Sequence, residues 1–170
     1  MNRLTLVLGG TRSGKSAHAE SLFAGAATPV YLATGSAGDA EMSRRIARHR
    51  SRRGAHWRTV EEPLDLAGAL VRESRPDSPI LVDCLTLWLG NLMGHERDAA
   101  AAFDELLAVL PALPGPVVMV SNEVGWGIVP DNELARRFRD HAGELHQRVG
   151  GVAASVILVV AGLPLFLKQT

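Results

Sequence analysis

The chain is poor in cysteine and has no excess of charge of either sign. Cys84 is the single cysteine in 170 residues, which excludes an internal disulfide and is typical of a reducing compartment. The 18 lysines and arginines balance 18 aspartates and glutamates, for a net charge of zero. A general nucleic-acid binder usually carries a basic excess, so this composition argues against that class.

Long apolar runs of the kind that span or cross membranes are also missing. No charged segment followed by an apolar stretch and a small-residue cleavage site opens the sequence, so we expect no secretion signal. The longest apolar stretch, residues 155–167, is too short to cross a bilayer and is interrupted by Gly162 and Pro164. We interpret it as a buried strand and expect a cytoplasmic protein.

The composition that is present, 46% hydrophobic and 21% charged residues, is that of an ordinary globular protein. Its length suits one domain spanning residues 1–170. Continuous apolar runs alternate with helix-length segments, which indicates a doubly wound α/β fold with a mainly parallel sheet and helices on both faces. The expected strands are 4–8, 29–34, 57–60, 79–84, 116–121 and 155–161, and the expected helices are 15–24, 39–53, 64–74, 85–110 with a break near Gly94, and 131–149.

A phosphate-binding motif follows the first expected strand. The sequence GGTRSGKS matches G-x-x-x-x-G-K-S and leads directly into an expected helix, the order that a P-loop NTPase-type fold requires. The glycines allow backbone N–H groups to surround phosphate oxygens, and the helix N-terminus adds a positive dipole end. A glycine-rich turn with an incidental lysine is the alternative. The predicted nucleotide-binding residues are Gly9, Gly10, Thr11, Arg12, Ser13, Gly14, Lys15 and Ser16.

Two further strand ends are candidate parts of the same site. Asp83 ends the apolar run ILVD, where a second anchor for Mg²⁺ is expected beside the Ser16 hydroxyl. The alternative is that Asp83 only caps the helix that follows. Thr34, Gly35 and Ser36 end another buried strand and are candidates for close approach to nucleotide, although an ordinary turn explains them equally well.

The stretch EMSRRIARHRSRRGAHWR, residues 41–58, holds seven arginines and two histidines. In a helix, Ile46, His49 and Arg53 share the face that looks toward the protein, whereas Arg44 and Arg48 point outward. Flanking arginines disfavour an imidazolium and attract phosphates, so His49 is a candidate nucleophile toward an α-phosphate. A packed structural histidine and a solvated basic helix are the alternatives.

Four stretches together resemble the bifunctional adenosylcobinamide kinase / adenosylcobinamide-phosphate guanylyltransferase family of cobalamin biosynthesis. They are GGTRSGKS (9–16), EMSRRIARHRSRRGAHWRTVEEP (41–63), VDCLTLWLGNL (82–92) and SNEVGWGIVPDNELARRFRD (121–140), in family order along most of the chain. One departure is Gly54, where many members have proline, and it affects loop stiffness more than chemistry.

The resemblance implies two reactions and a set of nucleotide contacts. Adenosylcobinamide is phosphorylated with ATP or GTP, and GMP is then transferred from GTP onto that phosphate through a guanylylated histidine, here His49. The resemblance further implies a corrinoid substrate and a trimer with sites between subunits. The GTP-contacting positions fall on residues 9–16, Thr34, Gly35, Ser36, Arg50, Ser51, Arg52, Arg53, Glu61 and Asp83. Without the resemblance, Glu61 is a solvated loop carboxylate.

Two other functions stay open on the sequence alone. A plain P-loop small-molecule kinase would use His49 only for packing. A nucleotide-binding module with an RNA- or protein-binding arginine helix is a third, disfavoured by zero net charge and by the lack of aromatic residues in 41–56. The segment SNEVGWGIVP, with Asn122, Glu123 and Trp126, lies at the ligand end of a strand, and we assign it no catalytic role.

Overall fold

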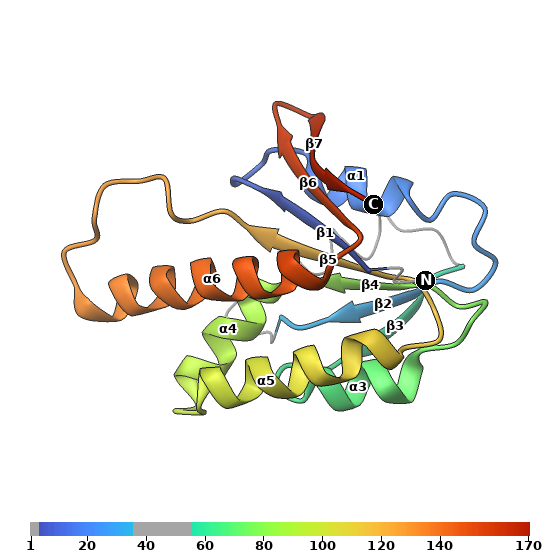
Figure 1. Cartoon of the computed structure of the whole chain (residues 1–170), viewed down its shortest axis with the longest axis horizontal. Helices are drawn as coiled ribbons and strands as arrows, with labels where there is room; N and C mark the ends of the chain where they lie inside the picture. Colours follow the sequence, from blue (N-terminus) through green and yellow to red (C-terminus); the bar gives the residue numbers. More distant parts are fainter. Residues whose placement is uncertain (1–3, 36–55) are drawn as a thin grey trace.

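The continuous apolar runs of the sequence form the strands of one sheet (Figure 1). The computed structural model describes residues 4–35 and 56–170. The strands in this part are β1 (Leu4–Gly9), β2 (Val30–Ala33), β3 (Arg58–Glu61), β4 (Ile80–Asp83), β5 (Val117–Asn122), β6 (Ser155–Val160) and β7 (Leu163–Gln169). Each strand predicted from the sequence is present, within a residue or two at its ends.

The strand order is β3-β2-β4-β5-β1-β6-β7, and every neighbouring pair is parallel except β6 and β7. The register pairs Ala33 with Asp83, Asp83 with Val120, and Gly9 with Asn122. The parallel strands therefore end together along one side of the sheet, which we call the carboxyl edge. In open α/β sheets this edge is where ligands bind. The predicted fold class is confirmed.

Helices cover both faces of the sheet (Figure 1). Alternate strand residues point to opposite faces, so Leu6 packs in one apolar cluster and Val7 in the other. The first cluster lies under the helices α3 to α6, and the second lies under α1. The helices are α1 (Lys15–Ser21), α3 (Leu66–Glu73), α4 (Leu85–Gly94), α5 (Ala99–Val109) and α6 (Glu133–Val152), with a 3-10 turn at Leu110–Ala112.

Helix boundaries follow the capping residues of the sequence. Asp65, Asp98 and Asn132 each accept a hydrogen bond from a backbone N–H in the first turn of α3, α5 and α6. The expected break near Gly94 separates α4 from α5. The expected helix 39–53 lies outside the described residues. Across the two described ranges, no helix is both long and apolar enough to span a membrane.

The apolar stretch 155–167 was expected to be one buried strand, and this prediction was wrong. The chain reverses at Ala161 and Gly162, which both have positive φ (52° and 80°), and β7 returns antiparallel to β6. Most of β7 is exposed, with Leu163 at 71% and Phe166 at 52%. Hydrophobicity alone does not tell a buried strand from an exposed apolar hairpin, because the turn needs only one glycine.

Candidate nucleotide site

The phosphate loop, residues 9–16, links the carboxyl end of β1 to the start of α1. Ser13 N–H donates to Gly10 O at 3.2 Å, so the loop turns sharply. Lys15 is 7% exposed, and its Nζ donates to Gly10 O at 3.1 Å, which folds the side chain back over the loop. Ser13 Oγ is buried and has no hydrogen-bond partner within residues 4–35 and 56–170. A buried unpaired hydroxyl inside such a loop fits a phosphate oxygen as its partner.

The loop glycines are required by close approaches to the β6–β7 hairpin. Gly14 has φ of 96°, and a Cβ on it would lie 3.0 Å from Gly162 Cα. A Cβ on Gly9 would lie 2.7 Å from Val159 O. Gly162 N–H also donates to Ser13 O at 2.8 Å. The hairpin turn thus forms a backbone support on which the phosphate loop rests.

Asp83 lies at the carboxyl edge, with β5 between its strand and β1. Two strand spacings put it about 10 Å from β1. Tyr31 donates its phenolic O–H to Asp83 Oδ2 at 2.6 Å, which orients the carboxylate. The capping position of α4 is Cys84, without a side-chain cap, so Asp83 does not play the helix-capping role considered from the sequence.

Cys84 is buried at the start of α4, and its thiol lies 3.2 Å from Thr86 Oγ1. Burial raises the pKa of the Cys84 thiol, and the negative charge of Asp83 raises it further. The thiol is therefore protonated near neutral pH, which is unsuited to a nucleophile. Cys84 belongs to the apolar cluster under α1.

Thr34 follows β2 at the carboxyl edge and is fully buried. Its hydroxyl donates to Cys84 O at 2.7 Å and accepts from Cys84 N–H at 2.9 Å. Its carbonyl accepts from the Asn91 side chain at 2.6 Å. These bonds connect the end of β2 to the start of α4. The Thr34 hydroxyl therefore already has both a hydrogen-bond donor and an acceptor within the protein. Next to it, a Cβ on Gly35 would lie 3.2 Å from Leu87 Cδ1.

Glu61 ends β3 and is exposed. Four strand spacings separate β3 from β1, so Glu61 lies about 19 Å from the phosphate loop along the edge. It cannot contact the same phosphate as Lys15. The predicted residues Ser36, His49 and 50–53 lie outside the described residues.

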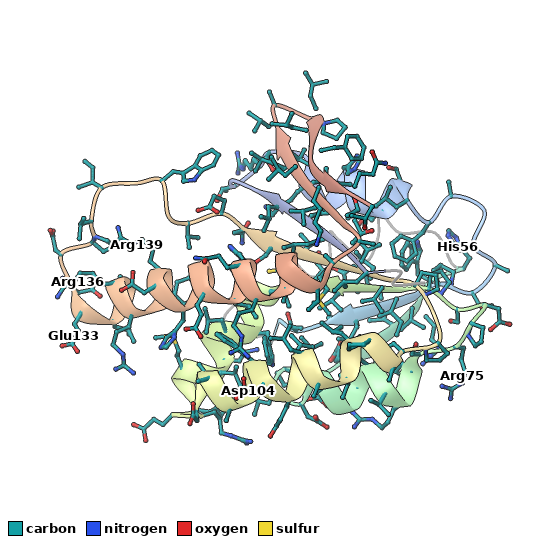
Figure 2. All side chains as sticks on the ribbon, viewed as in Figure 1. His56, Arg75, Asp104, Glu133, Arg136 and Arg139 are labelled. Atoms are coloured by element: carbon teal, nitrogen blue, oxygen red, sulfur yellow. The ribbon has the colours of Figure 1, made fainter. Side chains whose placement is uncertain are left out.

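His56 was interpreted as part of the turn before the third strand, and the structure confirms this. It precedes β3 and is exposed, with its ring centroid 5.9 Å from that of Trp57. Because β3 runs parallel to its neighbours, His56 lies at the end of the sheet opposite the carboxyl edge (Figure 2).

A pocket of about 500 Å³ opens beside the phosphate loop. One wall is Gly10 to Ser13, a second is Leu158 to Ala161, and the third is the segment after β5, with Glu123, Val124, Trp126 and Gly127. Trp126 is 77% exposed. The phosphate loop and the segment after β5 therefore face one another across a single cavity.

Residues 5–167 match the family described as cobinamide kinase / cobinamide phosphate guanyltransferase. The chain belongs to this family. The prediction from the four sequence stretches is confirmed, and the family description carries both activities, which favours the two-reaction prediction over the plain kinase.

Curated relatives of this cobinamide kinase family cover nearly the whole chain. The chain is 52% identical to the bifunctional adenosylcobalamin biosynthesis protein CobP of Pseudomonas aeruginosa, over 96% of each. It is 43% identical to the bifunctional adenosylcobalamin biosynthesis protein CobU of Salmonella typhimurium, over 97% of this chain and 99% of the relative.

Solved structures of distant proteins resemble the fold. The RadB recombinase has a TM-score of 0.54 at 15% identity, covering 92% of this chain and 74% of that one. An ATPase of a bacterial type III secretion system has a TM-score of 0.59 at 11% identity, covering 98% and 57%. At such identities the likeness concerns the fold alone.

In this member of the cobinamide kinase family, the sequence analysis assigned no role to a carboxylate that lines the pocket or to a histidine near that carboxylate. Glu123 comes directly after β5 and lines the cavity. His146, from α6, has its Nδ1 3.9 Å from Glu123 Oε2. The position of Glu123 directly after a buried strand could have indicated from the sequence that it lies at the ligand-binding edge of the sheet. His146 carries none, because it lies 23 residues further along in a regular amphipathic helix.

Proposed function

We propose that this protein catalyses two successive reactions of cobalamin biosynthesis. It phosphorylates the hydroxyl of the aminopropanol arm of adenosylcobinamide with ATP or GTP, and then transfers GMP from GTP onto that phosphate. The products are adenosylcobinamide-GDP and pyrophosphate. The observation that carries this proposal is the match over 5–167 to a family described by both activities. The sharply turned phosphate loop with Lys15 folded over it supports the proposal.

Phosphate binding is the task of the loop. Its backbone N–H groups and the Lys15 ammonium hold the β- and γ-phosphates, and the residues from Gly9 to Ser16 make these contacts. Lys15 rests on Gly10 O at 3.1 Å, so it needs only a small movement to exchange that carbonyl for a phosphate oxygen. The unpaired Ser13 Oγ supplies a further donor.

Mg²⁺ is the metal that fits the residues at this edge. The Ser16 hydroxyl and the Asp83 carboxylate are hard oxygen ligands, as Mg²⁺ prefers. Among the described residues, no three His, Cys, Asp or Glu side chains form a metal cage. Mg²⁺ commonly binds through one or two protein oxygens plus substrate phosphates, and when bound it neutralises charge on them. Tyr31 keeps the Asp83 carboxylate in place.

Guanylyl transfer is assigned to the arginine-rich stretch. A neutral His49 imidazole nitrogen attacks the α-phosphorus of GTP, the bond to the bridging oxygen breaks, and pyrophosphate leaves with the electron pair. An oxygen of the corrinoid phosphate then attacks the same phosphorus and releases His49. The proposed GTP contacts are Gly35, Ser36, Arg50, Ser51, Arg52, Arg53 and Glu61. Thr34 fixes the backbone next to Gly35 through its bonds to Cys84 and Asn91.

The setting of these reactions follows from the same family. We place the protein in the cytoplasm, in keeping with its one buried thiol. We propose a trimer in which neighbouring subunits complete each site.

Labelling with GTP carrying an α-phosphate label tests the covalent step. Wild-type protein with GTP and Mg²⁺ is expected to take up acid-labile, base-stable label. His49→Asn is expected to abolish it, and His56→Asn, a histidine at the opposite end of the sheet, is expected to retain it. Wild-type protein that stays unlabelled while phosphorylating the corrinoid alcohol would indicate a plain kinase.

A further inference from the structure

The pocket beside the phosphate loop has one acidic group on its wall. Of the described residues that line it, Glu123 is the only carboxylate, and the rest are glycines, small polar residues, apolar residues and Arg12. Its side chain is 20% exposed. A partly exposed carboxylate that shares a cavity with the phosphate loop is placed to contact a group that approaches the terminal phosphate of a nucleotide.

The backbone holds Glu123 in register with the phosphate loop. Glu123 N–H donates to Gly9 O at 3.1 Å, which extends the pairing of β5 with β1 by one residue into the loop. On the side chain, Oε1 accepts the Gly125 N–H at 2.6 Å. The carboxylate is therefore fixed relative to the residues that bind phosphate, as a group that acts on a reacting atom must be.

A histidine lies near the other carboxylate oxygen, and a serine is hydrogen-bonded to that histidine. His146 Nδ1 lies 3.9 Å from Glu123 Oε2, and His146 Nε2 lies 2.7 Å from Ser121 Oγ. Burial lowers the pKa of His146 against the smaller opposite effect of Glu123, so the ring is neutral near pH 7. The negative charge of Glu123 favours the tautomer with the ring proton on Nδ1, and in that tautomer Nε2 accepts from the Ser121 hydroxyl. Glu123 thus faces a dipole instead of a cation.

We propose that Glu123 is the general base of the kinase reaction, a role that rests on the proposed function. The oxygen of the acceptor hydroxyl bonds to the γ-phosphorus. The bond between that phosphorus and the β–γ bridging oxygen breaks, and its electron pair leaves on the nucleoside diphosphate. The hydroxyl proton passes to the Glu123 carboxylate. The pocket between Glu123, the phosphate loop and Trp126 is accordingly where the alcohol arm of the corrinoid enters.

The role is specific to one of the two reactions. In the kinase reaction the nucleophile is an alcohol, which must lose a proton. In guanylyl transfer the nucleophiles are a neutral imidazole and then an ionised phosphate oxygen, and neither needs a base. Removing the basicity of Glu123 should therefore separate the two activities.

Glu123→Gln is the sharpest variant, because glutamine keeps the oxygen that accepts the Gly125 N–H and loses only the charge and basicity. The kinase kcat for adenosylcobinamide is expected to fall about a hundredfold or more, with little change in the KM for nucleotide. Guanylylation of the protein by α-labelled GTP, and transfer of that label to adenosylcobinamide phosphate, are expected to stay within about threefold of wild type. Retained guanylylation also reports that the variant folds.

Glu133→Gln is the matched control. Glu133 is an exposed carboxylate at the start of α6, far from the sheet (Figure 2). It is expected to leave both activities unchanged. A Glu123→Gln kinase kcat within threefold of wild type would overturn the proposal. So would an equal loss of both activities, which would indicate a structural brace. Wild-type protein lacking both activities would instead reject the proposed function itself.

Discussion

His146 is a titratable side chain on the buried face of α6, beside Leu145 and Val149. Its ring is 8% exposed, and one nitrogen is bonded to Ser121, itself fully buried at the end of β5. Desolvation disfavours the charged form, and Glu123 at 3.9 Å offsets this only in part. Protonation of His146 at low pH is therefore expected to destabilise the fold next to Glu123, the proposed base.

The stability of the protein is expected to fall on acidification because of His146. Its pKa in the folded state is lowered from the ordinary 6.5. Above that value both states are neutral and the stability is complete. Below it, the imidazole of the unfolded chain is protonated while the buried ring of the folded protein stays neutral. The free energy of unfolding therefore declines until the pH falls below the pKa of the folded state. One proton contributes a slope of at most about 1.4 kcal/mol per pH unit.

Urea unfolding at pH 7.5, 6.5 and 5.5 checks this, with His146→Gln as the variant that cannot titrate. As the pH falls, the unfolding free energy of the wild type is expected to decrease more than that of His146→Gln. Curves that stay parallel across this range would contradict the expectation. Because the other histidines are common to both proteins, their titration cancels.

The structural placement of residues that are neighbours along the chain was predictable from the sequence. The phosphate loop is such a case, since strand, glycines, Lys15 and helix are contiguous. The contacts of Asp83 with Tyr31 and of Glu123 with His146 are different, because they join positions 52 and 23 residues apart. Only the parallel register and the packing of α6 bring them together, and neither is a property of a local pattern.

The phosphate loop and the turn between β6 and β7 pack backbone against backbone. Gly14→Ala is expected to destabilise the protein by about 2 kcal/mol or more, because the left-handed conformation alone costs about 1–2 kcal/mol for alanine. The new Cβ would also lie 3.0 Å from Gly162 Cα. Gly10→Ala, in the same loop, meets no atom within 4 Å and has no positive φ, and should change stability by less than about 0.5 kcal/mol. Chemical denaturation without nucleotide measures both. Equal losses in the two variants would contradict this expectation.

The strands and helices were predictable where burial sets the pattern, and the hairpin was not. Parallel strands covered on both faces have continuous apolar runs, and α3, α5 and α6 begin at capping residues. The stretch 156–167 of the hairpin is also apolar apart from its turn, although β7 is solvent-exposed. The apolar sequence therefore predicted β6 correctly, but it wrongly predicted that residues 163–167 are buried. The sequence pattern does not distinguish an apolar residue on the surface of the protein from one in its core.

Within the part of the chain that the structure describes, exposed apolar residues form two surfaces, and both reach the pocket beside the phosphate loop. The hairpin surface is formed by the end of β6 and by β7, an edge strand at the end of the sheet (Figure 1). It consists of Val160, Leu163, Leu165, Phe166 and Leu167, each more than half exposed. The segment surface covers the segment after β5 and the first turn of α6, and consists of Trp126, Ile128, Val129 and Leu134. Monomers rarely expose such patches, and an uncovered apolar edge strand invites pairing.

Two different surfaces suit a head-to-tail contact, which closes into a ring such as a trimer. Sedimentation is expected to give three times the chain mass of 18.2 kDa for the wild type. Phe166→Asp and Ile128→Asp should each give the monomer, whereas Val71→Asp, on α3 and 56% exposed, should stay trimeric. A wild-type monomer, or a trimeric Phe166→Asp, would contradict the assembly.

Mixing the two disrupted variants tests the pairing of the surfaces directly. Phe166→Asp keeps an intact segment surface, and Ile128→Asp keeps an intact hairpin surface. In a head-to-tail ring these two intact surfaces meet, so an equimolar mixture is expected to form a species of about two chains that cannot grow further. If each surface instead pairs with its own copy, the mixture contains no mixed dimer, and each variant alone dimerises through its remaining surface. Sedimentation of the mixture against each variant alone distinguishes the two arrangements.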